Sequence, residues 1–152
     1  MKIFRSAEVP AQAGDPKTFT GDVVRATLAG DTVGTPVNVY RVEFEPGART
    51  HWHTHDGPQW LFVIEGRIRV QKLGEPATDV TAGDAVVIQP GEKHWHGGTP
   101  SQRGVHLAVN VKAATSWMEP VTDAQYLGGA DLQVSRRCRP ECLRYCRAIS
   151  HV

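Results

Sequence analysis

Turn-forming residues divide this chain into short segments along most of its length. The 152 residues include 15 glycines and 10 prolines, scattered between apolar stretches rather than gathered in one region. Pro-Gly, Gly-Asp and Asp-Gly-Pro steps of this kind mark turns between strands. Roughly seven or eight short strands, spaced about ten residues apart, predict an all-β sandwich or barrel. The length suits one such domain with a sizeable core.

The clearest strands either alternate between apolar and polar residues or are continuously apolar; they are Val37–Glu45, Trp60–Ile64, Arg67–Leu73, Ala85–Ile88 and Gly104–Lys112. Trp60–Ile64 is apolar at every position, which predicts a strand buried on both faces. Gly66 is expected to form a turn that separates this strand from the next one.

Elsewhere the pattern is weaker. A short strand is expected at Lys2–Arg5, followed by loops up to residue 36. His51–His55 is expected to be extended, and Val80 marks another short strand. Thr122–Leu127 predicts a short helical turn capped by Thr122, because threonine is a good N-cap residue.

Charge and hydropathy exclude several functional classes. The net charge is +1, which provides no electrostatic basis for binding nucleic acid or an anionic membrane. The N-terminus lacks the apolar core of a signal peptide, and no apolar run is long enough to span a membrane. We therefore expect a soluble, cytoplasmic protein that acts on a small molecule.

The composition changes abruptly near the C-terminus. We expect one domain over residues 1–134 and a basic tail over residues 135–152, which is disordered or an artefactual extension. All three cysteines lie in this tail, four residues apart, and Pro140 interrupts any helix that would align them. Zinc-binding pairs usually have closer spacing, so the tail is not expected to be a metal site.

Histidines gather in two short clusters, and a glutamine follows the first. On an extended strand, His51, His53 and His55 share one face, and His94 and His96 share a face of another segment. Imidazole is the commonest metal ligand near neutral pH. Three imidazoles and one carboxamide oxygen would leave open positions on an octahedral ion, as in catalytic sites. The alternative is a set of solvent-exposed histidines beside turns.

The spacing of these residues resembles that of a known family. Gly47-x5-His53-x-His55-x3-Gln59-x6-Gly66 matches the first motif of the cupins, with Gln59 where that motif has glutamate. The resemblance implies a single-domain cupin, an all-β fold in which an antiparallel β-barrel or jelly roll holds a metal ion.

The second cupin motif is matched less closely. Gly83-x7-Gly91-x2-His94-x3-Gly98 departs from it at Gln89, where the motif has proline, and at Gly98, where it has asparagine. Over residues 19–126 the chain is similar to small cupins that include the bacterial manganese-dependent hydroxynitrile lyases. This resemblance implies one divalent ion, manganese first and iron, nickel, cobalt or zinc as alternatives, held by four ligands: His53, His55, Gln59 and His94.

A neutral ligand in the glutamate position has a chemical consequence. A carboxylate would cancel one unit of the ion's charge, whereas the Gln59 carboxamide cancels none. The ion would then be a stronger Lewis acid toward an alkoxide or cyanide. It would also be held less tightly than by three histidines and a glutamate.

Two further histidines are candidates for catalysis. His106 shares a strand face with Ala108 and Asn110, which either faces water or, as the resemblance implies, lines the barrel beside the metal. In the latter position His106 is the leading general base. His96 either points into the pocket or orients a metal ligand from outside it.

The expected substrate pocket comprises five residues: Tyr40, Val42, Phe44, His51 and Asn110. Tyr40, Val42 and Phe44 share one strand face and form an apolar wall, whose alternative role is ordinary core packing. His51 is expected near the rim. In the hydroxynitrile lyases a small residue stands at position 51 and alanine at position 40, so both positions alter the pocket.

Three functions follow from this interpretation. The favoured one is a metal-dependent, hydroxynitrile-lyase-like lyase, in which the metal acts as a Lewis acid on a cyanohydrin and His106 takes the hydroxyl proton. The second is an Fe(II) dioxygenase of a small diketone, phenol or thiol, and the third is a non-catalytic metal-containing cupin that binds a small molecule. A homodimer or homo-tetramer is expected, because the apolar strand Trp60–Ile64 needs cover.

Overall fold

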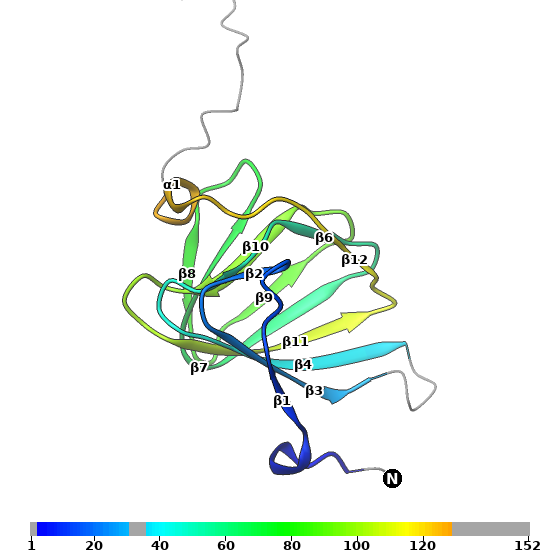
Figure 1. Ribbon diagram of the computed structural model, residues 1–152. Helices are drawn as coiled ribbons and strands as arrows, with labels where there is room; N and C mark the ends of the chain where they lie inside the picture. Colours follow the sequence, from blue (N-terminus) through cyan, green and yellow to red (C-terminus); the bar gives the residue numbers. More distant parts are fainter. Residues whose placement is uncertain (1–2, 31–35, 129–152) are drawn as a thin grey trace, which may run out of the picture.

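A computed structural model of the chain describes residues 3–30 and 36–128 (Figure 1). The elements follow one another as η1 (Ser6–Glu8), β1 (Ala11–Ala13), β2 (Phe19–Thr20), β3 (Val23–Ala29), β4 (Val37–Phe44), β5 (Arg49–Thr50), β6 (His53–His55), β7 (Gln59–Lys72), β8 (Thr78–Thr81), β9 (Ala85–Ile88), β10 (His94–Gly98), β11 (Gly104–Val111), β12 (Thr115–Trp117) and α1 (Asp123–Tyr126). The predicted all-β fold is confirmed. In these two ranges no helix has the length and apolar character needed to cross a membrane. The tail predicted over residues 135–152, and its boundary, lie outside the described residues.

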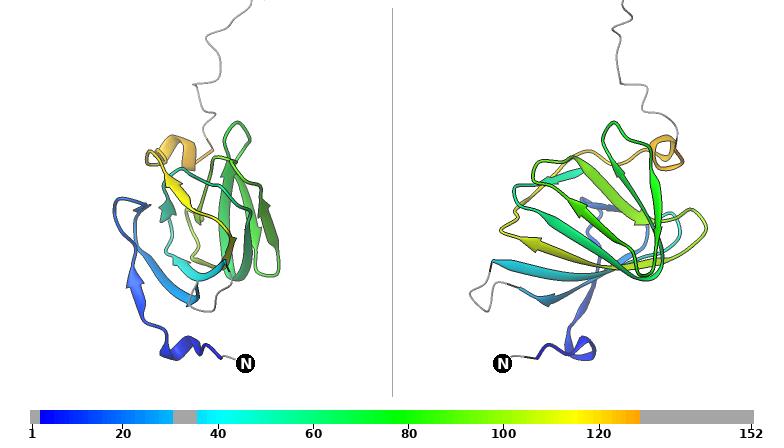
Figure 2. Two further views of the ribbon diagram at one scale, coloured as in Figure 1. Left: turned by 90° about the vertical axis from the view of Figure 1, so that its right-hand side faces the viewer. Right: turned by 180° about the vertical axis from the view of Figure 1, so that it is seen from behind.

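The strands form one antiparallel sheet that curls into a barrel (Figures 1 and 2). Its main path runs β1-β3-β4-β11-β7-β10-β5-β2, so strands that are distant in the sequence lie side by side. The strand β7 belongs to both walls of the barrel. Its first half pairs with β11 and β9, and its second half pairs with β10 and β8.

The turn predicted at Gly66 is wrong, because β7 continues through this residue as a single strand of 14 residues. Gly66 has a φ of +64°, and a Cβ atom there would lie 2.2 Å from the carbonyl oxygen of Arg103. Glycine is therefore required for the chain to bend at this corner without breaking the strand. The bend transfers β7 from one wall of the barrel to the other.

The prediction that the strand Trp60–Ile64 is buried on both faces is also wrong for the single chain. Leu61 and Val63 are buried, whereas Phe62 and Ile64 are 42% and 46% exposed. Alternate side chains of a strand point to opposite faces, and only the inner face is covered here. The expected apolar strand thus has an uncovered outer face.

The N-terminal region differs most from the prediction. Residues 3–5 are irregular and lead into η1, so the strand predicted at Lys2–Arg5 is wrong over its described part. The predicted loops contain β1, β2 and β3, which raise the strand count to 12. Strands of two or three residues are too short to show a periodic pattern, and β3 lacks a clear one.

Other predicted elements are confirmed. The strand predicted at Val37–Glu45 is β4, and the strand predicted at Gly104–Lys112 is β11. The helical turn α1 begins after Thr122, whose side chain accepts a hydrogen bond from the backbone of Gln125, while Gln125 reciprocates in a capping box.

The segment around α1 holds two strands of the barrel together. The buried Arg49 guanidinium on β5 donates to the carbonyl of Val121 at 2.9 Å and to the Asp123 carboxylate at 2.6 Å. The Tyr126 hydroxyl donates to the carbonyl of Gly98, at the end of β10, at 2.7 Å. Both interactions fix β5 and β10 next to each other, and β10 carries two of the histidines.

Candidate metal centre

Six polar side chains from four strands are buried together inside the barrel: His53 and His55 from β6, Gln59 from β7, His94 and His96 from β10, and His106 from β11. Each of them is at most 4% exposed. Residues that lie opposite each other on antiparallel strands point to the same face, and His94 lies opposite His53 in this way. The fold thus brings residues more than 50 positions apart into one site.

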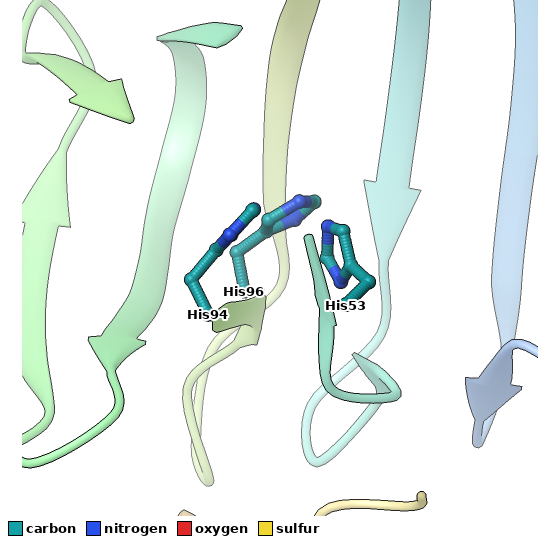
Figure 3. A group of neighbouring side chains, drawn as sticks. All are labelled: His53, His94 and His96. Carbon is teal, nitrogen blue, oxygen red and sulfur yellow. The ribbon is translucent and has the colours of Figure 1, made fainter. Parts of the chain in front are cut away.

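Three of the histidines form a compact group. His53, His94 and His96 each offer one nitrogen, and these nitrogens lie within 4.8 Å of one another (Figure 3). The His55 ring lies next to them, with its centroid 5.1 Å from that of His53 and 5.4 Å from that of His94. Such a group of imidazoles is suited to holding a divalent metal ion.

Backbone carbonyls determine which nitrogens face the group. Nδ1 of His53 lies 2.9 Å from the carbonyl oxygen of His51, and Nδ1 of His94 lies 2.8 Å from that of Glu92. A carbonyl can only accept, so each Nδ1 carries the proton and each Nε2 keeps its lone pair. This arrangement is typical of metal-binding histidines. Nδ1 of His55 lies 3.0 Å from the Thr115 hydroxyl, and its buried Nε2 has no hydrogen-bond partner among the described residues.

Gln59 places a carboxamide oxygen beside the imidazole nitrogens. Its Nε2 donates to Oδ1 of Asn110 at 2.9 Å, which turns its Oε1 toward the histidines, 3.1 Å from Nε2 of His94. Neither of these last two atoms carries a proton when His94 is neutral, so two lone pairs face each other in a buried space. A metal ion between them would remove this repulsion. The residues present therefore fit a divalent cation.

The histidines of the site are uncharged at neutral pH. Burial lowers the pKa of His94 to about 4 and that of His106 to about 3. Burial, followed by repulsion from neighbouring imidazoles, also holds the pKa values of His53 and His96 well below the usual 6.5. Neutral imidazoles keep the lone pairs that a metal or a proton requires.

Acid is expected to destabilise the metal-free protein. Histidine titrates near 6.5 when unfolded, so between about pH 6.5 and 4 the unfolded chain binds more protons than the folded one. The free energy of unfolding is therefore unaffected above that window and decreases as the pH falls through it. His94 and His106 would each lower it by about 2 kcal/mol at pH 5. Denaturant titration of chelator-treated protein at pH 7.5 and pH 5 measures this, and equal values would contradict it.

His96 and His106 form a hydrogen-bonded pair beside the metal group. Nδ1 of His96 lies 3.1 Å from Nε2 of His106, and the outer nitrogens, His96 Nε2 and His106 Nδ1, have no partner among the described residues. The Phe44 ring packs against both imidazoles, with centroids 5.9 Å and 5.5 Å away. This pair can accept a proton at one end and share it along the hydrogen bond.

A cavity of about 110 Å³ opens onto the histidines. The predicted pocket residues that line it are Tyr40, Val42 and Asn110. Phe44 lies behind the wall, fully buried. The His51 side chain is buried rather than at the rim, and the residue contributes its carbonyl to His53.

The catalytic candidates differ in their access to this cavity. His96 lines it together with the candidate ligands His53, His55 and Gln59. His106 is 0% exposed and reaches the cavity only through its bond to His96. The face shared by His106, Ala108 and Asn110 is buried inside the barrel, so the alternative that it faces water is wrong.

Several lining residues were not expected from the sequence; they are Phe19, Arg25, Thr50, Thr115 and Trp117. Phe19 and Arg25 come from the N-terminal strands that lack a clear periodic pattern, and the others come from β5 and β12, which have two or three residues. Only a recognisable strand pattern around residue 25 could have indicated from the sequence that this segment belongs to the cavity wall. Their place in the wall follows from the sheet order.

A second hollow, of about 280 Å³, lies beside His94 and Trp95. Its charged residues are already paired, since Lys72 bonds to Glu75 at 3.3 Å and to Glu92 at 2.9 Å. The cavity lined by histidines is therefore the candidate functional site.

Comparison with known proteins agrees with this geometry. The model of the cupin domain family matches residues 40–110, which include every candidate ligand. An (R)-mandelonitrile lyase of Granulicella tundricola is 40% identical over 129 residues, which cover 83% of this chain and 98% of that protein.

Solved structures show the same fold. A cupin-like protein from Thermotoga maritima has a TM-score of 0.73 and 40% identity. The match covers 75% of this chain and 89% of the Thermotoga chain. The polyketide cyclase RemF from Streptomyces resistomycificus has a TM-score of 0.68 over 83% of this chain and 90% of its own. At 20% identity, the second likeness concerns the fold alone.

Proposed function

The chain belongs to the cupin family, and on that premise we propose that it is a metal-dependent lyase that cleaves cyanohydrins into a carbonyl compound and hydrogen cyanide. The observation that carries the proposal is the buried His96–His106 pair, which opens onto a cavity beside a group of neutral imidazoles. A protein with 40% identity to this chain is an (R)-mandelonitrile lyase, which supports the same reaction type.

In this proposal His53, His55, Gln59 and His94 hold the divalent ion, with manganese favoured and iron, nickel, cobalt or zinc as alternatives. The unprotonated Nε2 atoms of His53 and His94, the unpartnered Nε2 of His55 and the inward-facing Oε1 of Gln59 support this set. When bound, the ion supplies Lewis acidity toward the substrate oxygen and the departing anion.

The His96–His106 pair is proposed to move the proton. His96 lines the cavity and receives the hydroxyl proton at Nε2, while its Nδ1 proton passes to Nε2 of His106, the base that finally holds the charge. The carbon–carbon bond breaks as the carbonyl forms, and cyanide leaves with the bonding electrons. Return of the proton through His96 gives hydrogen cyanide and restores the neutral pair. Burial keeps both rings unprotonated at pH 7, so they can accept a proton, but it also makes them weak bases; a bound ion would compensate by lowering the pKa of the substrate hydroxyl.

Anaerobic turnover tests the proposal. The metal-loaded protein is expected to release cyanide and aldehyde from mandelonitrile at the same rate with and without oxygen, because cleavage is redox-neutral. A strict oxygen requirement, with oxygen consumed in step with product, would instead support the dioxygenase. Stable metal binding without turnover of any cyanohydrin would favour the non-catalytic binding protein.

Replacing Gln59 with glutamate is expected to tighten metal binding about tenfold or more and to lower the rate of cyanohydrin cleavage. The added carboxylate attracts the ion and cancels one unit of its charge. Asn110 can turn its amide to donate to the new carboxylate, so the fold should tolerate the change.

Metal titration by calorimetry and steady-state kinetics measure the two effects of this substitution. Asn110→Asp is a matched control, because it places a carboxylate next to Gln59 rather than in the ligand position. Equal or faster turnover in Gln59→Glu would contradict the role of the neutral ligand.

The uncovered apolar face is proposed to pair with a second copy of the chain. Phe62 and Ile64 on β7 and Val87 on β9 are 42%, 46% and 51% exposed, and Trp60, opposite Val87, points to the same side. A homodimer or homo-tetramer would cover this face, and sedimentation equilibrium measures its formation.

A further inference from the structure

One permanently charged side chain lines the histidine cavity. Arg25 lies on β3 and is half-buried, with its guanidinium carbon 5.3 Å from the centre of the Tyr40 ring. A cation at this distance is attracted to the ring face, which holds the guanidinium against the cavity wall.

The sheet register orients Arg25 toward the reaction site. Arg25 lies opposite Val42, and Val42 lies opposite His106 on the next strand. Residues in such a cross-strand row point to the same face, and both Val42 and Arg25 line the cavity. Adjacent strands lie about 4.8 Å apart, so the Cα atoms of Arg25 and His106 are roughly 10 Å apart. A small substrate whose hydroxyl meets His96, the hydrogen-bond partner of His106, would therefore lie within reach of Arg25.

Arg25 has no counter-ion among residues 3–30 and 36–128. Of the arginines described, Arg5, Arg41, Arg49, Arg69 and Arg103 each pair with a carboxylate, whereas Arg25 and Arg67 do not. Arg67 is exposed to solvent and lies outside the cavity, so it needs no partner. Arg25 is different, because its charge is partly shielded from water.

The cavity contains no negative charge of its own. None of the described residues that line it is an aspartate or a glutamate, and the glutamine ligand keeps the proposed metal shell neutral. Arg25 and a divalent ion would therefore both favour an anionic ligand.

We infer that Arg25 binds the carboxylate of the substrate, which would be a short aliphatic aldehyde acid, or its cyanohydrin, with the carboxylate a few carbons from the reacting carbon. The inference rests on the proposed function for the reaction, but the carboxylate contact is independent of it. A guanidinium binds a carboxylate through two parallel hydrogen bonds, which gives both strength and orientation. The Cα atoms of Arg25 and His106 lie only roughly 10 Å apart, so a short chain is long enough for the carboxylate to meet Arg25 while the reacting carbon lies beside the histidines.

Equilibrium binding of succinate tests the contact without catalysis. Calorimetric titration of the metal-free and manganese-loaded protein with succinate is compared for wild type, Arg25→Gln, Arg25→Lys and the control Arg67→Gln. Arg25→Gln is expected to weaken succinate binding by about 10- to 100-fold in both forms, the range for hydrogen bonds to a charged group. Arg25→Lys should restore part of the affinity, and Arg67→Gln should bind like wild type.

Kinetics with matched substrates tests the specificity. Wild type should convert the cyanohydrin of succinic semialdehyde with a kcat/KM about 10- to 100-fold higher than that of pentanal, mainly through a lower KM. Arg25→Gln should remove this preference and leave the neutral substrate within a few-fold of wild type. A preference that persists in Arg25→Gln, or equal loss for both substrates, would overturn the inference.

The lyase reaction and the carboxylate site at Arg25 can be disproved independently of each other. If no cyanohydrin is cleaved but succinate binding still depends on Arg25, the lyase is wrong and the carboxylate site stands. If cleavage proceeds while succinate binds equally to wild type and Arg25→Gln, the carboxylate site is wrong and the lyase stands.

Discussion

Replacing His106 with alanine is expected to lower the kcat for cyanohydrin cleavage by about 10²- to 10⁴-fold, the contribution of a positioned general base. In the wild type, Nε2 of His106 lies 3.1 Å from Nδ1 of His96, and the substitution removes the acceptor at the end of this pair. His106 does not line the cavity, so substrate binding and KM should change little. Steady-state kinetics with mandelonitrile, together with metal content by elemental analysis, measures the effect.

The His106→Gln variant separates chemistry from packing. Alanine leaves a hole beside Phe44, whereas glutamine fills a similar volume and can hydrogen-bond to His96 but cannot take up a proton. Both variants should retain the metal and lose turnover to a similar extent. Restored turnover in His106→Gln would contradict the base assignment and leave His106 a positioning residue.

The second large effect concerns which residues bind the metal ion. The compact group of three histidines and the proposed set of four ligands are not the same. The group of three nearest nitrogens contains His96, whereas the proposed set contains His55 and Gln59. His55→Ala is expected to lose most of its bound metal and at least about 10³-fold in turnover, because loss of the ion removes its Lewis acidity. His96→Ala is expected to keep the metal and lose turnover only through the proton path.

The two variants form a matched pair, since both replace a buried histidine of the same cavity. Chelation of the wild type should reproduce the loss in His55→Ala, and adding manganese back should restore only the wild type. Thermal unfolding gives a second measurement, because a bound ion at about 100 times its Kd stabilises the fold by about 2.7 kcal/mol. Loss of metal in His96→Ala with retention in His55→Ala would move the ligand set to His53, His94 and His96.

Much of the barrel could be predicted because its longer strands carry their own signal. The alternation in Val37–Glu45 and Gly104–Lys112 identified β4 and β11, and the N-cap residue Thr122 identified α1. The sequence predicts a turn at Gly66, because glycine is common both in turns and at bends within strands. The structure shows a bend, where the carbonyl of Arg103 comes so close to Gly66 that no side chain would fit.

The candidate site was predictable in its residue types but not in its connections. The spacing of His53, His55, Gln59 and His94 matches a metal-binding motif, and the structure gathers these residues in one buried space. The sequence did not indicate that His96 stands between the cavity and His106. That arrangement depends on ring orientations on two strands that are not bonded to each other.

By itself, the sequence determined that this protein is a β-barrel of the cupin family with a histidine-rich site, because turn residues and ligand spacing are local properties of the chain. Only the tertiary structure decided which side chains share the cavity. Arg25 lies in a segment without a clear strand pattern, yet it stands in one cross-strand row with Val42 and His106. The physical reason is that strand register and sheet order depend on pairing between distant segments, which no short stretch of sequence specifies.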